Sequence, residues 1–348
     1  NISVSQANEI NALTTGAVTA TISTGDMATL NGLEGTGNVY SITVADTSAA
    51  ASDLIALDAK TTGVVNANAV TTLNGTLADI TSVLALETAT TTTIPANVAV
   101  VVTDTISATQ AEALTVNAQI GTGVVTATVT ADQADDLRAA LSNTAADVLS
   151  LTVLEDTGAT DAADLLLLDG LTAGTIDVSN VTAVQGLVAE LTAAAGIYGK
   201  ADIIGLGNDQ AITENSGAAI SVANANALAA LTTGAVTAQV TGTANALTAL
   251  NETGHAYTLT VADANGATAV SDLLALNGTT TVSVNATALD SDGTTSLSGT
   301  YTQIKALFAA AANGDYTGLQ ADLPIAVTGG NISVSQANEI NALTTGAV

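Results

Sequence analysis

The chain of 348 residues contains no cysteine and no tryptophan, and aromatic residues make up 2% of it. The absence of cysteine excludes disulfides, thiol catalysis and thiolate metal ligands. The scarcity of aromatic side chains argues against an ordinary globular core, which takes much of its burial from them. Because 47% of the residues are nevertheless hydrophobic, mostly Ala, Val, Leu and Ile, the composition favours thin and regular layers.

Basic residues are almost absent. There are four, against 32 acidic residues, and the formal net charge is −28. Nucleic-acid binding needs clustered Lys and Arg, so it is excluded as a main function, and docking to anionic lipid is disfavoured. No apolar run reaches the roughly 18 residues of a membrane span. The charge fits a protein that stays soluble at high local density or works with divalent cations.

Histidine occurs once, as His255 in the sequence NETGHAYT. It precedes an expected strand, and no thiol or second histidine is available to join it. We therefore expect a surface turn residue rather than a catalytic base or metal ligand. Gly-rich phosphate loops are absent as well. The sequence predicts that the protein is not an enzyme.

The first eighteen residues, NISVSQANEINALTTGAV, return unchanged as residues 331–348, so the spacing from Asn1 to Asn331 is 330 residues. A repeat of this kind indicates a tandem array. We interpret the chain as one block of 330 residues and the start of the next, within a longer tandem polymer. Inside the block, three units recur at residues 1–104, 105–218 and 219–330, and they begin with the related motifs ISVSQANEI, ISATQAEAL and ISVANANAL.

Each unit alternates short runs of apolar residues and Thr or Ser with segments rich in Ala and Leu. The runs predict strands at residues 18–22, 41–45, 64–67 and 98–103. The Ala- and Leu-rich segments predict helices at residues 6–13, 53–57, 77–86 and 134–141, with Ser, Thr or Asp as caps. We expect the glycines of Thr15-Gly16, Thr62-Gly63 and Thr233-Gly234 to form left-handed turns that end helices.

The period of one strand and one helix, which we call a rung, is about 25–28 residues. A repeat this short predicts an α/β repeat solenoid, in which stacked rungs form a continuous parallel β-sheet with helices on the other side. A mostly-β parallel β-solenoid is the alternative. Three longer rungs add residues 87–95, 196–210 and 313–324 at equivalent places, and we expect these to form one ridge of loops suited to binding.

Acidic residues recur at the ends of equivalent strands, at Asp46, Asp156 and Asp263. Clusters of oxygen ligands suit calcium, and Asp290 and Asp292 lie in a D-x-D-G sequence that lacks the EF-hand spacing and its closing Glu. These five aspartates are the candidate calcium ligands. The alternative is that they cap helices and make turns.

The segments ALTTGAVTA, LIALDAKTTGVVNANAVTTLNGT and SDLLALNGTT resemble the Ala/Thr/Val-rich repeats of giant tandem-repeat cell-surface proteins of marine cyanobacteria and related bacteria. The resemblance spans nearly the whole chain. It implies a secreted, structural protein at the cell surface, and it carries over no catalytic residue.

These observations predict a structural extracellular protein that forms a fibre, stalk or surface coat from tandem blocks. Neither copy of the eighteen residues resembles a polar cap, so we expect the blocks to stack head-to-tail on one another. The alternative is an adhesin that binds glycans or another cell through the loops of the longer rungs. Those loops contain few aromatic residues on which a sugar could stack, Tyr198 and Tyr316.

Overall fold

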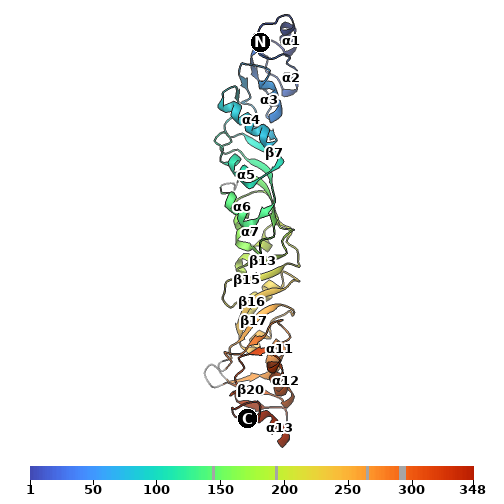
Figure 1. Cartoon of the computed structure of the whole chain (residues 1–348), viewed down its shortest axis with the longest axis vertical. Coiled ribbons are helices and arrows are strands. Elements are labelled where there is room, and N and C mark those ends of the chain that lie inside the picture. Colours follow the sequence, from blue (N-terminus) through green and yellow to red (C-terminus); the bar gives the residue numbers. More distant parts are fainter. Residues whose placement is uncertain (143–145, 193–194, 264–265, 290–294) are drawn as a thin grey trace. The chain divides into compact units, whose positions relative to one another are not determined.

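The computed structural model describes residues 1–142, 146–192, 195–263, 266–289 and 295–348 (Figure 1). Contacts between Cα atoms divide the chain into two compact units. Unit 1 comprises Asn1–Leu154, Leu167–Val178 and Asp202–Ile204, and unit 2 comprises Glu155–Leu166, Ser179–Ala201 and Gly205–Val348. Each unit contains two β-sheets, in which all strand pairs are parallel, and a series of helices.

In unit 1, the first sheet has the strand order β1-β2-β4-β6, and the second has the order β14-β12-β10-β8-β7-β5-β3, with β9 beside β10. The strands of the first sheet are β1 (Thr19–Thr21), β2 (Val39–Thr43), β4 (Val65–Asn66) and β6 (Thr92–Thr93). Those of the second are β3 (Ser48–Ala50), β5 (Thr72–Gly75), β7 (Ala99–Ile106), β8 (Val125–Val129), β9 (Asp132–Gln133), β10 (Val148–Leu154), β12 (Ile176–Asp177) and β14 (Ile203–Ile204). The helices are α1 (Val4–Ala12), α2 (Met27–Leu30), α3 (Ala51–Asp58), α4 (Leu77–Thr88), α5 (Ala108–Thr115) and α6 (Ala134–Ala140).

In unit 2, the sheets have the orders β11-β13-β15-β16-β17-β19-β21 and β18-β20-β22. The strands of the first sheet are β11 (Thr160–Asp161), β13 (Ala183–Gly186), β15 (Ala211–Glu214), β16 (Val236–Gly242), β17 (Ala256–Val261), β19 (Val284–Asn285) and β21 (Tyr316–Thr317). Those of the second are β18 (Gly266–Ala269), β20 (Thr295–Gly299) and β22 (Ile325–Val327). The helices are α8 (Val188–Leu191), η1 (Ile197–Gly199), α9 (Val222–Ala229), α10 (Ala244–Leu247), α11 (Val270–Leu276), α12 (Tyr301–Ala312) and α13 (Val334–Asn341), while α7 (Ala162–Asp169) has residues in both units.

The strand and helix predictions are confirmed at every predicted segment, with bounds that differ by at most three residues. The described residues form thirteen α-helices, and the twelve intervals from Val4 to Val334 span 330 residues, an average of 27.5. The fold is therefore mixed α/β with several parallel sheets, which favours the α/β prediction over the mostly-β alternative. The prediction of a single continuous sheet was wrong. The strands form four sheets among the described residues, because the chain turns a corner within a rung. For example, β2 ends at Thr43 in one sheet and β3 begins at Ser48 in another.

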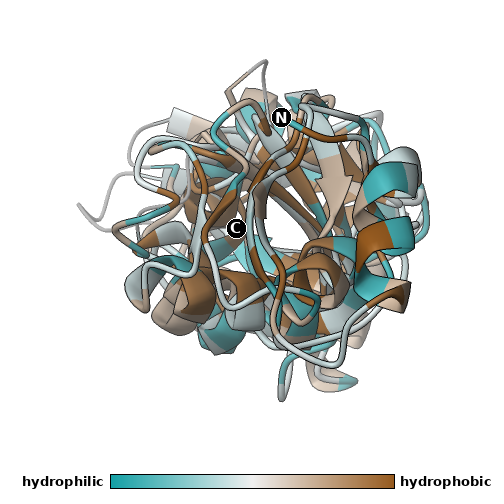
Figure 2. Cartoon of the chain, turned by 90° about the horizontal axis from the view of Figure 1, so that it is seen from above, coloured by the Kyte–Doolittle hydropathy of each residue, from teal (hydrophilic) through white to brown (hydrophobic). Residues whose placement is uncertain are grey.

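Alternation of apolar and polar side chains explains how such short strands bury a core. In β10, Leu149, Leu151 and Val153 are buried while the residues between them are not. Figure 2 shows hydrophobic and hydrophilic residues interspersed along the ribbons. On the helices, Ala111 of α5 and Ala225 of α9 are completely buried, since a methyl group is all that the close packing leaves room for.

Side-chain oxygens cap most of the helices, as the sequence predicts, but α3 begins after Ala50 without a side-chain cap. In the capped helices, the hydroxyl or carboxylate of the residue before the helix accepts a hydrogen bond from a main-chain N–H of the first turn. These residues are Ser3, Asp26, Thr76, Ser107, Ser221, Thr243, Thr300 and Ser333.

The Thr-Gly sequences have a different role from the one expected. Gly63 and Gly234 do not adopt the left-handed conformation. Instead, a Cβ atom at Gly63 would overlap the carbonyl oxygen of Tyr40, and one at Gly174 would overlap that of Leu149. These glycines are needed because main chain passes against main chain of the preceding strand.

The threonine two residues before each of these glycines links the glycine segment to the preceding strand by hydrogen bonds from its hydroxyl. The buried hydroxyl of Thr172 accepts hydrogen bonds from the N–H groups of Leu149 and Gly174, both at 2.9 Å, and lies 3.0 Å from the Leu149 carbonyl oxygen. Four further buried threonines make corresponding contacts. They are Thr61 in unit 1 and Thr232, Thr280 and Thr344 in unit 2.

Replacement of Thr172 by valine is expected to lower the free energy of unfolding by about 2 kcal/mol, because it keeps the shape but leaves two buried N–H groups without an acceptor. Thr172→Ser retains the hydroxyl and should cost less than half as much. Urea denaturation of both variants, followed by circular dichroism, measures the difference. Equal losses for valine and serine would contradict a role for the hydroxyl.

Candidate functional site

Two of the candidate calcium ligands cap helices. A carboxylate oxygen of Asp46 accepts a hydrogen bond from the N–H of Met27, the first residue of α2, at 2.6 Å. In unit 2, Asp263 accepts from the N–H of Ala244, the first residue of α10, at 3.2 Å, and from the hydroxyl of Thr268. Each aspartate follows the next strand along the chain, so it satisfies an N–H of the helix before it and complements the helix dipole.

The remaining candidates are not brought together by the structure. Asp156 is half-buried after β10. Asp290 and Asp292 lie outside the described residues. Over the parts of the chain that the structure describes, no three or more His, Asp or Glu side chains are grouped so that they could hold a metal ion. Calcium binding stays a prediction, and the observed helix caps are the alternative that the sequence offered.

His255 is buried, with 4% of its surface exposed, so its prediction as a surface turn residue was wrong. Its Nδ1 atom accepts a hydrogen bond from the N–H of Val236, the first residue of β16, at 3.1 Å. Its Nε2 atom lies 3.7 Å from a carboxylate oxygen of Glu252, and its ring lies 5.2 Å from that of Tyr257. The imidazole therefore satisfies the buried main-chain N–H at the start of β16.

Asn38 and Asp147 occupy the corresponding places in unit 1. The side-chain oxygen of Asn38 accepts from the N–H of Val18 at 2.9 Å, and that of Asp147 accepts from the N–H of Val125 at 2.6 Å. Three different residue types thus perform one task, which is to satisfy a buried N–H at the start of a strand. Because Asn, Asp and His share only a hydrogen-bond acceptor, residue identity gave no sign of this equivalence.

Asp147 performs the task at an electrostatic cost. Burial raises the pKa of its carboxyl group, the hydrogen bond from Val125 lowers it, and the negative charge of Glu112 raises it again, with a net increase. An increased pKa in the folded state means that the charged form is the less stable one in the fold.

Asp147→Asn is therefore expected to increase stability at neutral pH, since the amide oxygen can accept the same hydrogen bond without the charge. The folded carboxyl group retains its proton to a higher pH than the unfolded one. The contribution of Asp147 to stability is thus present below the ordinary pKa of 3.8 and is lost as pH rises through the higher folded value. Unfolding free energies of the wild-type and Asp147→Asn proteins should be measured between about pH 3 and 7. The advantage of the variant should grow as pH rises above the ordinary pKa of Asp147. An unchanged difference across the range would contradict this.

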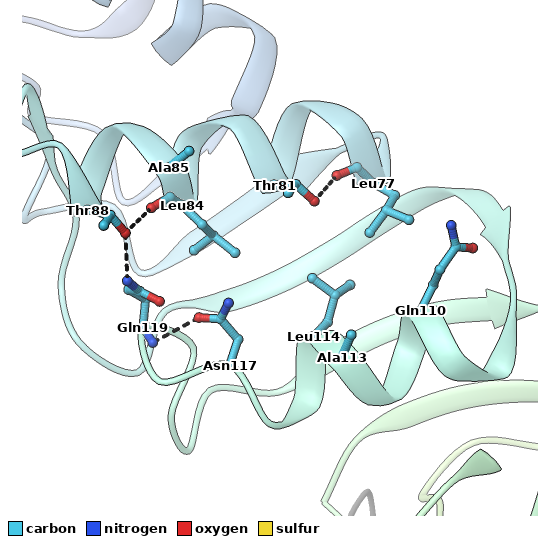
Figure 3. Close-up of a pocket in the computed structure, with 10 residues that line it drawn as sticks. All are labelled: Leu77, Thr81, Leu84, Ala85, Thr88, Gln110, Ala113, Leu114, Asn117 and Gln119. Atoms are coloured by element: carbon cyan, nitrogen blue, oxygen red, sulfur yellow. Dashed lines mark hydrogen bonds between the residues drawn. The ribbon is translucent and has the colours of Figure 1, made fainter.

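A groove of about 440 Å³ lies between α4 and α5 in unit 1 (Figure 3). Leu77 and Leu84 of α4 face Leu114 of α5 across it. One end is closed by a hydrogen bond of 3.1 Å from the Gln119 side chain to the Thr88 hydroxyl. The lining residues are all uncharged. They are Leu77, Thr81, Leu84, Ala85, Thr88, Gln110, Ala113, Leu114, Asn117 and Gln119.

The groove offers apolar surface, hydroxyls and amides, but its lining has no titratable group that could act as an acid or base or activate the Thr81 and Thr88 hydroxyls. In unit 2, the helices α12 and α13 both begin with a capping box. A polar bridge joins these two helices, in contrast to the apolar groove between α4 and α5. The hydroxyl of Tyr301 donates to a carboxylate oxygen of Glu339 at 2.6 Å, and the Lys305 ammonium lies 3.1 Å from the same oxygen.

No family model matches the chain, and neither a curated protein nor a solved structure is significantly similar to it. Within the described residues, no helix has both the length and the apolarity needed to cross a membrane.

The additional residues of the longer rungs are not loops alone. Residues 87–95 include the end of α4 and all of β6, residues 196–210 include η1 and β14, and residues 313–324 include β21.

Proposed function

We propose that the chain is a structural repeat protein, an α/β solenoid whose 330-residue blocks stack head-to-tail in an extracellular fibre, stalk or coat. The regular return of helix, corner and parallel strands supports the solenoid architecture. The proposed location follows from the resemblance of its Ala/Thr/Val-rich segments to giant cell-surface repeat proteins. The observation that carries the stacking is the environment of the two identical eighteen-residue segments.

The first copy is satisfied on the side that faces the following residues. Asn8 donates to the Gly32 carbonyl at 2.8 Å and accepts from the N–H of Glu34 at 2.9 Å. Asn11 accepts from the amide of Asn38 at 2.9 Å. On the other side, Ile10 and Leu13 are exposed by 41% and 87%.

The second copy is satisfied on the opposite side. Ile340, which corresponds to Ile10, is completely buried, and Thr344 donates to the Leu323 carbonyl at 2.7 Å. Val334, which corresponds to the half-buried Val4, is exposed by 79%. The two copies therefore use complementary faces of one sequence. A rung that had both sets of neighbours would be buried on both sides, as interior rungs are.

A chain in which residues 19–348 follow Val348 tests the proposal. If blocks stack, this two-block chain should unfold in one transition at a higher temperature than the single block, since it gains an interface without adding a free end. Amide hydrogens of residues 331–348 should also exchange more slowly at the junction than in the single block. Two particles separated by a flexible joint in electron micrographs, with an unchanged melting temperature, would refute it.

A further inference from the structure

Unit 2 contains a built surface that holds residues 331–348, which we call the receiving surface. It is formed by residues 301–327. The side chains of Tyr301 and Lys305 contact Glu339, as described above. The main chain of the receiving surface also forms hydrogen bonds with the main chain of residues 331–348. The N–H of Ile325 donates to the Ala347 carbonyl at 2.8 Å, and the N–H of Thr345 donates to the Ala321 carbonyl at 2.7 Å. The main-chain hydrogen bonds fix the register of the bound segment, and the bridge to the Glu339 side chain recognises its sequence.

Residues 1–18 have the same sequence and leave the corresponding groups accessible. Glu9, Ile10 and Leu13, which match Glu339, Ile340 and Leu343, are all exposed. Thr14, which matches the buried Thr344, is also exposed and accepts a hydrogen bond only from the N–H of Gly16 among the described contacts. This face is complementary to the receiving surface by identity of sequence, and contacts with residues 19–38 leave it free.

We propose that residues 1–18 of a second copy of the chain can bind the receiving surface in place of residues 331–348. This proposal rests on the proposed stacking. The partner is a second copy of the chain, and residues 331–348 of the first copy compete with it for the receiving surface. The intermolecular contact would repeat the intramolecular one group for group. It is head-to-tail and does not close on itself, so it would propagate along a fibre.

The two occupants compete with unequal effective concentrations. The attached segment is held next to the surface at an effective concentration on the order of millimolar, whereas another molecule binds at its actual concentration. At micromolar concentrations, residues 331–348 therefore outcompete residues 1–18 of another molecule for the receiving surface; we call them the latch. A change that weakens only the second copy should release the surface to the first copy of another molecule.

Because the two copies can be altered separately, matched substitutions test the exchange in the full chain. Ile340→Asp places a carboxylate in a fully buried apolar site and should release the latch. Sedimentation velocity should then show oligomers that grow with concentration, while wild type and Ile10→Asp stay monomeric. The double variant Ile10→Asp/Ile340→Asp should be monomeric, since the replacement segment can no longer dock.

A second pair of substitutions serves if Ile340→Asp disturbs the rest of the unit. A Cβ at Gly346 would overlap the Asp322 carbonyl, whereas one at Gly16 meets only the Thr14 hydroxyl, at 3.6 Å. Gly346→Ala should assemble and Gly16→Ala/Gly346→Ala should not. A monomeric Gly346→Ala protein with native circular dichroism and rapid amide exchange in residues 331–348 would overturn the exchange. So would oligomers that persist in both double variants. Neither result alters the two-block experiment, which tests stacking in a covalent chain.

Discussion

Gly174→Ala is expected to lower the free energy of unfolding of unit 1 by about 4 kcal/mol, a loss in the range that marks a serious backbone conflict. The backbone of Gly174 is not in the left-handed region, so alanine could adopt its conformation. The cost is steric, since the added methyl group would overlap the Leu149 carbonyl, and that carbonyl belongs to β10 in the middle of a sheet. Relief would require the two passing chains to separate, which would break the hydrogen bonds of Thr172.

Gly16→Ala is the matched control for this prediction. Gly16, like Gly174, has a threonine two residues before it, but no main chain passes against it. The substitution should change the unfolding free energy by less than about 0.5 kcal/mol, as surface substitutions usually do. Urea denaturation of both variants measures the difference. Similar losses at the two positions would show that chain flexibility, rather than close approach, explains the glycines.

Ala111→Leu is expected to cost about 3 kcal/mol, because α5 has no room for three more carbon atoms. Ala111 is completely buried, with 0% of its surface exposed. The expected result is a lower denaturation midpoint with little change in the slope against urea concentration.

Ala337→Leu provides the comparison, since Ala337 has the corresponding place in α13 and is half-buried. It should be nearly neutral in the single block. In the two-block chain, where the following block would cover it, the same substitution should become costly. An equal effect in both chains would contradict the close packing of successive helices.

The sequence was sufficient to locate the strands and helices that it predicted, because alternation and 3.6-residue spacing are local properties, but strands such as β3 and β5 were not predicted. It did not separate two uses of glycine. A left-handed turn and a close approach of main chain both select glycine, and only the second is present at Gly63, Gly174 and Gly234. The sheet division was missed for a related reason, since a corner between two short strands leaves no break in the apolar pattern.

The candidate site was predicted less well than the fold. Asp46 and Asp263 were recognised as equivalent, but the N–H groups that they accept from belong to helices 19 residues earlier in the chain. His255 was placed at the surface because a polar residue before a strand usually lies there. Its partner, the N–H of Val236, is likewise 19 residues away, and only the fold reveals that pairing.

Several side-chain hydrogen bonds between successive segments are completed by the later segment. The N–H of Val18 is satisfied by Asn38, that of Met27 by Asp46 and that of Tyr40 by Thr61, so in each case the later residue completes the earlier segment. A ribosome releases the N-terminal end first. Each segment can therefore lock as soon as its successor emerges, without waiting for distant parts of the chain. This order would let a nascent chain of any length fold vectorially, with only its newest segment incomplete and open to proteases or aggregation.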